Sequence, residues 1–151
     1  MKERKMNNKG FSLVELIIVI AIMAILIVVL APQYLKYVEK SRNSTDVTNA
    51  TEIVTAIQVY AADPDATKPF SSGDKFTITV TDKNGNLTSD PNGSIADALN
   101  QAGITITDTK CSSKTKWKQY VIKGEVMPNG SIAFDYENDD FKNAMNGKSS
   151  S

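Results

Sequence analysis

Residues 11–35 read FSLVELIIVIAIMAILIVVLAPQYL, and this stretch decides the fold. Its only charged residue is Glu15, and residues 16–31 are all Leu, Ile, Val, Ala or Met. A helix of these 25 residues would be about 37 Å long, enough to cross a hydrocarbon core of about 30 Å. The stretch therefore predicts a helix that needs a membrane or sister helices around it.

A basic cluster precedes the apolar stretch. Residues 1–10 contain three lysines and one arginine against a single glutamate, whereas residues 11–151 hold thirteen basic and sixteen acidic residues. Basic residues before a spanning helix favour a cytoplasmic N-terminus, so we expect everything after Leu35 to lie outside the plasma membrane. The mildly acidic body has no basic excess for sequence-independent binding of nucleic acid.

Two simpler kinds of segment share part of this pattern. A cleaved secretory signal fits Val-Leu-Ala at 29–31, but its apolar core is longer than the usual ~7–15 residues and Pro32 would follow the cut. An uncleaved signal anchor explains the length and the charge, but it gives Glu15 no role. A carboxylate at mid-membrane costs on the order of 3 kcal/mol. Glu15 therefore either lies at the interfacial edge with its head in water or needs a partner.

Residues 9–16, KGFSLVEL, followed by an apolar helix and Pro32, resemble the class III signal of type IV prepilins. The resemblance implies that a prepilin peptidase cuts after Gly10 and then N-methylates the new α-amine of Phe11. It implies that Glu15 pairs with the N-terminal amine of a neighbouring subunit during assembly. It also implies that the helix kinks or loosens near Pro32, which lacks a backbone donor.

The same resemblance implies a function and partners. The chain would be the structural subunit, or pilin, of a type IV pilus: a single-pass plasma-membrane precursor that polymerises into an extracellular helical homo-oligomer on the cell surface. Such filaments support cell adhesion, twitching or other surface motility, or DNA uptake. Assembly would use a membrane platform and a cytoplasmic ATPase, since the chain has no P-loop pattern. With one cysteine, the chain lacks the disulfide of many Gram-negative pilins and looks like a Gram-positive, clostridia-like relative.

The helix is expected to continue to about residue 62. Apolar residues recur at spacings of three and four between positions 47 and 61, which is typical of an amphipathic helix packed against a sheet. Intervening polar residues such as Asp46 and Glu52 would face water, and Asp63-Pro64 would end the helix. The expected core positions are Val47, Ala50, Val54, Ile57 and Ala61.

The remaining residues predict antiparallel strands. Residues 76–80 alternate before an Asn-Gly turn at 83–86, and residues 118–127 and 131–136 flank a Pro-Asn-Gly turn. These patterns predict two hairpins.

Short elements fill the space between and after the hairpins. A helix is expected at 95–102, with Ser94 as its N-cap, Asp97 completing a capping box and Gly103 as its stop. A returning strand at 104–107 and a last helical turn at 139–145 are also expected.

The residue types needed for most catalysis are missing. The chain has no histidine, and Cys111 is its only cysteine, so it cannot build a His/Cys metal site or a Ser-His-Asp or Cys-His pair. We expect no catalytic residue, no metal and no cofactor, and we expect Cys111 to be a small buried residue. The turn at 82–86 lacks the glycine and glutamate of a calcium loop, and the acids at 135–140 are interpreted as a solvated surface.

Three lysines alternate in one segment. Lys114, Lys116 and Lys118 would share one face of an extended strand, with Trp117 turned to the core. With an exposed Tyr120 they could touch nucleic acid or a host surface. A soluble strand face, whose lysines discourage edge pairing, is the favoured interpretation.

These patterns predict an α+β fold: a long N-terminal helical stalk, apolar and then amphipathic, packed on a small antiparallel β-sheet head. The expected parts are a cleaved leader at 1–10, a transmembrane or filament-core helix at 11–35, its amphipathic half at 36–62, and the head at 63–151. Two alternatives stay open. One is a minor pilin or pseudopilin of a type II secretion or competence machine, and the other is an uncleaved, signal-anchored extracellular binding module.

Overall fold

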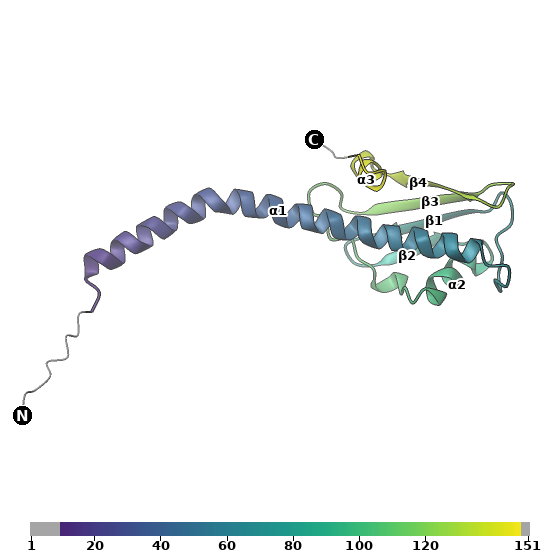
Figure 1. Cartoon of the computed structure of the whole chain (residues 1–151), viewed down its shortest axis with the longest axis horizontal. Coiled ribbons are helices and arrows are strands. Elements are labelled where there is room, and N and C mark those ends of the chain that lie inside the picture. The colour runs from purple at the N-terminus through teal and green to yellow at the C-terminus, as the bar shows by residue number, and fades with distance from the viewer. Residues whose placement is uncertain (1–9, 149–151) are drawn as a thin grey trace, which may run out of the picture. The chain divides into compact units, whose positions relative to one another are not determined.

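One long helix dominates the described part of the chain. The structure, a computed structural model, describes residues 10–148, so all of the expected leader except Gly10 lies outside the described residues. Helix α1 covers Leu13–Ala61 without interruption, close to the predicted span (Figure 1). The chain divides into two compact units, Met1–Val38 and Glu39–Ser151, and α1 contributes residues to both.

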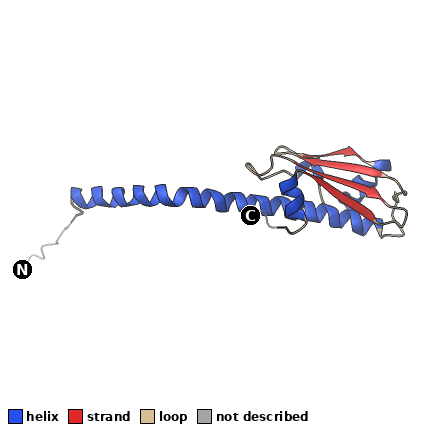
Figure 2. Cartoon of the chain, turned by 90° about the horizontal axis from the view of Figure 1, so that it is seen from above, coloured by secondary structure: helices blue, strands red, loops and turns tan. Residues whose placement is uncertain are grey.

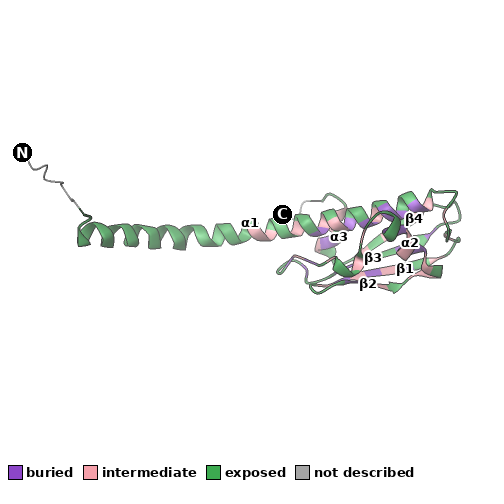
Figure 3. Ribbon diagram, turned by 90° about the horizontal axis from the view of Figure 1, so that it is seen from below, coloured by how far each residue is buried: buried purple, intermediate pink, exposed green. Residues whose placement is uncertain are grey.

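In the first unit, α1 is apolar on all sides and has no buried residue. Every residue from position 10 to position 37 is exposed, and Figure 3 shows this part of the helix in continuous green. Ile17 is 52% exposed and Val28 is 74% exposed. The helix satisfies its own backbone, but its side chains have no apolar partners within the described chain. Such a surface is stable only in lipid or against other helices.

The second unit is built in two layers. Its half of α1 covers one face of a four-stranded antiparallel sheet with the strand order β2-β1-β3-β4, as Figure 2 shows. The fold is therefore the predicted α+β arrangement of a long helix packed on a small antiparallel sheet. The strands are β1 (Lys75–Val80), β2 (Gly85–Ser89), β3 (Tyr120–Val126) and β4 (Ile132–Glu137).

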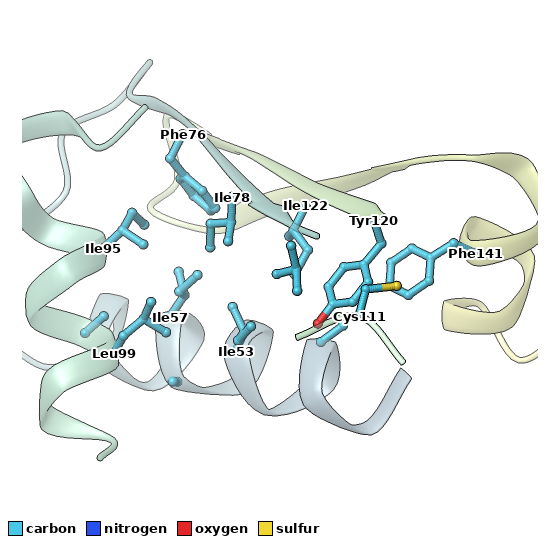
Figure 4. Packing of buried hydrophobic residues seen from close by; sticks show 14 of the residues in the cluster. Ile53, Ile57, Phe76, Ile78, Ile95, Leu99, Cys111, Tyr120, Ile122 and Phe141 are labelled. Atoms are coloured by element: carbon cyan, nitrogen blue, oxygen red, sulfur yellow. The ribbon is translucent and has the colours of Figure 1, made fainter. Parts of the chain in front are cut away.

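The core lies between α1 and the sheet. Ile53 and Ile57 of α1 face Ile78 and Ile122 of the two central strands, and all four side chains are buried (Figure 4). Helix α2 (Ser94–Gln101) closes the core beside β2, and helix α3 (Asp139–Met145) adds Phe141 beside β4. Burial of these large apolar side chains is the main stabilising contribution of the unit.

Both predicted hairpins are confirmed. Strand β1 pairs with β2, and β3 pairs with β4 across a turn in which Gly130 has a φ of 81°. The central pairing places Phe76 opposite Gly124, where a Cβ atom would lie 2.0 Å from the Cζ atom of Phe76. Glycine is required at that position because the aromatic ring lies directly across the neighbouring strand.

The predicted strand at 104–107 is wrong. These residues form an irregular segment that leads into a 3₁₀ turn at Ile106–Asp108. The N–H of Ile104 donates to the carbonyl of Leu99 at 2.8 Å, which closes the C-terminus of α2 after Gly103. The N–H of Asp108 donates to the carbonyl of Thr105. Local turns therefore take up backbone groups that a strand would have paired with the sheet.

The predicted cap of α2 is also wrong. Ser94 lies inside the helix and is buried, and the carboxylate of Asp90 accepts hydrogen bonds from the N–H groups of Ile95 and Ala96 at 2.8 and 3.1 Å. Asp97 does not complete a capping box; its carboxylate pairs instead with Lys68. The N-terminal donors of α2 are satisfied from a residue before the helix, as orphan N–H groups require.

The inward face of α1 is rotated from the predicted one. Ala50 and Ile57 are buried as expected, but Ile53 and Tyr60 also face the core, and Asp46, which was expected in water, is fully buried. Burying a charged group is costly unless hydrogen bonds replace its water. The carboxylate of Asp46 therefore needs several donors around it.

Those donors come from the loop at residues 110–118, here named the lysine loop. The Asp46 carboxylate accepts from the backbone N–H of Ser112 at 2.6 Å, the backbone N–H of Ser113 at 2.9 Å, the indole N–H of Trp117 at 2.8 Å and the thiol of Cys111 at 3.3 Å. A second carboxylate, about two turns earlier on α1, binds the same loop. Glu39 accepts from the Ser113 hydroxyl and from the N–H groups of Lys114 and Thr115, each at 2.8 Å.

The structure predicts that Asp46 is essential for the stability of the globular unit. Asp46→Ala leaves buried donors without acceptors, so we expect the free energy of unfolding to fall by roughly 3 kcal/mol or more. The change is measured by denaturant unfolding of the full chain in detergent, followed by the fluorescence of Trp117. Glu52→Ala, at an exposed position of the same helix, is the matched control. A loss under about 1 kcal/mol for Asp46→Ala would contradict this account.

Glu39 makes a pH-dependent contribution to stability. Its partial burial alone would raise its pKa, but the hydrogen bonds from Thr115, Ser113 and Lys114 outweigh burial and lower the pKa to about 2. Because the pKa is lower in the folded state, the contribution is present above the ordinary value of 4.5 and is lost as the pH falls from there toward 2. We therefore expect the stability of Glu39→Gln to change less than that of the unsubstituted chain across this window. Parallel stability curves would exclude the contribution.

Candidate functional site

Three predicted site residues lie within six residues of chain at the start of α1. Gly10 and Phe11 precede the helix and are exposed, Phe11 to 91%, and Glu15 lies in the first helical turn. A Cβ atom added to Gly10 would meet nothing within 4 Å. The described chain therefore does not itself require glycine at this position, and the cleavage expected after Gly10 stays a prediction.

Ser12 and Glu15 form a reciprocal N-terminal cap. The N–H of Ser12 donates to Oε2 of Glu15 at 2.9 Å, and the N–H of Glu15 donates to the hydroxyl of Ser12 at 3.3 Å. This is a capping box, in which two side chains satisfy two of the free N–H groups at a helix start. The negative charge of Glu15 also lies at the positive end of the helix dipole.

Ser12 was missed in the sequence analysis. Its signal was available, because Ser-x-x-Glu directly before an apolar run is a recognised N-terminal pattern. The capping box fixes the Glu15 side chain in one position at the head of the helix. Among residues 10–148, Oε1 of Glu15 accepts no hydrogen bond, so one oxygen of this carboxylate stays open to a further donor.

Beyond Glu15, the site is an apolar helical surface. Within the described residues, α1 is the helix that is long and apolar enough to cross a membrane, and none of its most apolar window is buried. Pro32 lies inside α1, and helical residues continue on both sides of it. Pro32 lies several turns after Glu15 on the same helix, so the two residues do not form one site. The loosening of the helix at Pro32 stays a prediction.

The other candidate residues of the sequence analysis lie in the second unit. Cys111 and Trp117 are buried as predicted, but Tyr120 is also buried, at 1% exposure, so it cannot stack on a ligand as proposed. Lys114, Lys116 and Lys118 are exposed in a loop and not on the face of a strand. The expected strand face is therefore wrong, because the carboxylates of α1 hold this backbone away from the sheet ladder.

Two acids of the patch at 135–140 and the buried cysteine make structural contacts. Asp135 pairs with Lys142, and Glu137 pairs with Lys123. Within residues 10–148, no group of three or more His, Cys, Asp or Glu side chains is arranged to hold a metal ion. Burial and the neighbouring Asp46 carboxylate raise the pKa of Cys111 to about 12, so its sulfur stays a protonated thiol at neutral pH and is a poor nucleophile.

The comparisons with known proteins concern the same N-terminal segment. A family model for the prokaryotic N-terminal methylation motif matches residues 5–31. No curated protein and no solved structure matches the chain. The matched residues include Gly10, Phe11, Ser12 and Glu15 and most of the exposed apolar helix.

The motif has general consequences for the fate of the chain. It implies processing by a prepilin peptidase and assembly of filaments through the platform machinery. With the apolar helix, it fits a precursor anchored in the membrane that later becomes extracellular, and it indicates a structural subunit more than an enzyme. The methylation motif at the start of a long apolar helix, and that helix packed on a four-stranded antiparallel sheet, together support a type IV pilin-like protein.

Proposed function

We propose that the chain is a pilin, the structural subunit of a type IV pilus, which a prepilin peptidase cuts after Gly10 and N-methylates at Phe11. The observation that carries the proposal is the apolar half of α1, exposed throughout, whose only charged side chain is Glu15 at its first turn. A filament core of parallel copies would bury this surface. The proposal also explains why the apolar segment at residues 11–35 carries its one charge at its start.

Glu15 would act between subunits. Its Oε2 atom is occupied by the N–H of Ser12 in the same chain, and its Oε1 atom is open among the described residues. Cleavage after Gly10 would create a cationic amine on Phe11 of each subunit. A charged pair between Oε1 and the amine of a neighbour would compensate two groups that are costly to bury singly, and it would set the axial register of the filament.

Before assembly, the same helix would lie in the plasma membrane. The basic leader favours a cytoplasmic N-terminus, which places the globular unit outside the cell. Residues 1–10 would then be the cleaved leader, residues 11–35 the membrane and filament-core segment, residues 36–62 the amphipathic half of the helix, and residues 63–151 the head. Pro32, which cannot donate a helical hydrogen bond, would be the point where the helix loosens in the filament.

A minor pilin or pseudopilin of a secretion or competence machine is the second candidate. The methylation motif supports it equally, because such subunits share the leader and the apolar helix. Adhesion and surface motility are roles of whole filaments and follow from the first candidate, whereas DNA uptake is compatible with both. Abundance of the chain in filaments sheared from cells separates the two.

The proposal predicts that the charge of Glu15 is required for assembly and that its capping role is not. Glu15→Gln keeps a capping-box acceptor but removes the charge, so we expect the leader to be removed normally and filaments to be absent. Ser12→Ala removes the hydroxyl of the cap and keeps the charge. It should cost the helix about 1 kcal/mol and leave filaments in place. Filaments are counted by electron microscopy, and processing is followed by the mass of the membrane-held protein.

The two variants distinguish between explanations. Normal filaments in Glu15→Gln would refute the charged pair between subunits. Loss of filaments in Ser12→Ala, with normal filaments in Glu15→Gln, would mean that assembly depends on the capping box and not on the charge of Glu15.

A further inference from the structure

The lysines of the second unit fall into two groups. Those on the sheet and beside it are paired with carboxylates: Lys68 with Asp97, Lys75 with Glu125, Lys123 with Glu137 and Lys142 with Asp135. In contrast, Lys40 on α1 and Lys110, Lys114 and Lys118 of the lysine loop take part in none of the ion pairs among residues 10–148. Lys83, between β1 and β2, and Lys148, after α3, are likewise in none of these ion pairs. The lysine loop nevertheless holds three of these six lysines, and Lys40 directly follows Glu39, which binds the loop.

The lysine loop is a strongly basic segment. It reads KCSSKTKWK, with four lysines and no acidic residue. Its Cys111 and Trp117 side chains are buried, whereas Lys110, Lys114 and Lys118 are exposed. The inward and outward side chains therefore divide by type, and the loop presents positive charge to its surroundings.

The backbone of this loop is fixed before any partner arrives. Asp46 accepts the N–H groups of Ser112 and Ser113, and Glu39 accepts those of Lys114 and Thr115. These contacts turn the backbone donors toward α1. A surface ordered in advance binds with less loss of conformational entropy.

The loop is tied to a residue close to the end of the apolar stretch. Glu39 follows Leu35, the last residue of the charge-free segment, by four positions, and four residues span at most about 14 Å even when fully extended. If residues 11–35 cross the membrane, as the proposed function requires, Glu39 and the loop bound to it stay near the outer membrane surface. Long lysine side chains at that level meet lipid headgroups.

We propose that the lysine loop binds the phosphate groups of anionic phospholipids on the outer surface of the membrane while the precursor awaits assembly. The proposal rests on the proposed function, because it needs the membrane-spanning state. Lysines next to an anionic surface contribute a favourable electrostatic attraction that salt weakens. Nucleic acid also carries phosphate, but single-strand binding depends on aromatic side chains for stacking, and Trp117 and Tyr120 are both buried.

The binding would have a consequence for assembly. It would hold the globular unit at the membrane surface until the subunit is extracted. Entry into the filament would then break the contacts between the loop lysines and the lipid headgroups. It would also break the contacts between the apolar helix and the lipid.

The test uses the full chain in nanodiscs of phosphatidylcholine alone or mixed with phosphatidylglycerol. The rate at which an amine-reactive reagent acylates each lysine is measured by mass spectrometry. We expect Lys110, Lys114 and Lys118 to react about threefold more slowly, or slower still, in the anionic discs. Raised salt should remove the protection. Lys75 and Lys123, which are paired on the sheet, are the internal controls and should react equally in both discs.

A pair of variants tests whether the loop acts as one surface. In Lys114→Gln/Lys118→Gln, the protection of Lys110 by phosphatidylglycerol should be lost. The matched control Lys75→Gln/Lys123→Gln removes the same charge from the sheet and should keep that protection.

The outcomes separate this proposal from the proposed function. If the chain resists extraction from the discs by alkaline carbonate but the loop lysines react equally in both lipids, the headgroup proposal is overturned and the membrane-held precursor stands. If the chain is extracted from both discs, the spanning helix is contradicted and the headgroup proposal fails with it. Stronger protection by a short DNA strand in phosphatidylcholine discs than by phosphatidylglycerol would assign the loop to nucleic acid and overturn the lipid assignment.

Discussion

The apolar surface of the first half of α1 has no partner within the described chain, and the rest of the account depends on this constraint. A helix satisfies its own backbone hydrogen bonds, so lipid or other apolar helices can surround it without penalty. Water cannot surround the helix without penalty, because its side chains are exposed from position 13 to position 37 and Glu15 is the only charged one before Lys36. Membrane residence and later assembly with copies of the same helix are two solutions to one physical problem.

Three carboxylates on α1 adapt this helix to its surroundings. Glu15 caps the helix with Ser12 and keeps one oxygen open among the described residues. Glu39 and Asp46 are engaged by donors of the lysine loop. The first is suited to a partner from outside the chain, whereas the other two hold the chain to itself. The same chemical group thus serves assembly at one end of the helix and folding farther along it.

Local patterns in the sequence predicted the long helix, both hairpins and α3, because helical periodicity and turn residues act over a few positions. The burial of Asp46 was missed because its donors come from residues 65 to 71 positions away, and no local pattern records them. The strand predicted at 104–107 failed because the end of α2 claims the N–H of Ile104. Gly10, Phe11 and Glu15 lie close together at the start of α1. Their roles depend on an enzyme and a neighbouring subunit, and these roles remain predictions.

The most direct test of the central claim is the N-terminus of the protein taken from cells, from sheared filaments and from membranes. Intact mass and N-terminal peptide sequencing should find an N-methylated Phe11 as the first residue, with residues 1–10 removed. A chain that retains Met1 would contradict prepilin processing and favour an uncleaved anchor. A chain that begins at Pro32 would contradict it equally and would indicate an ordinary secreted domain.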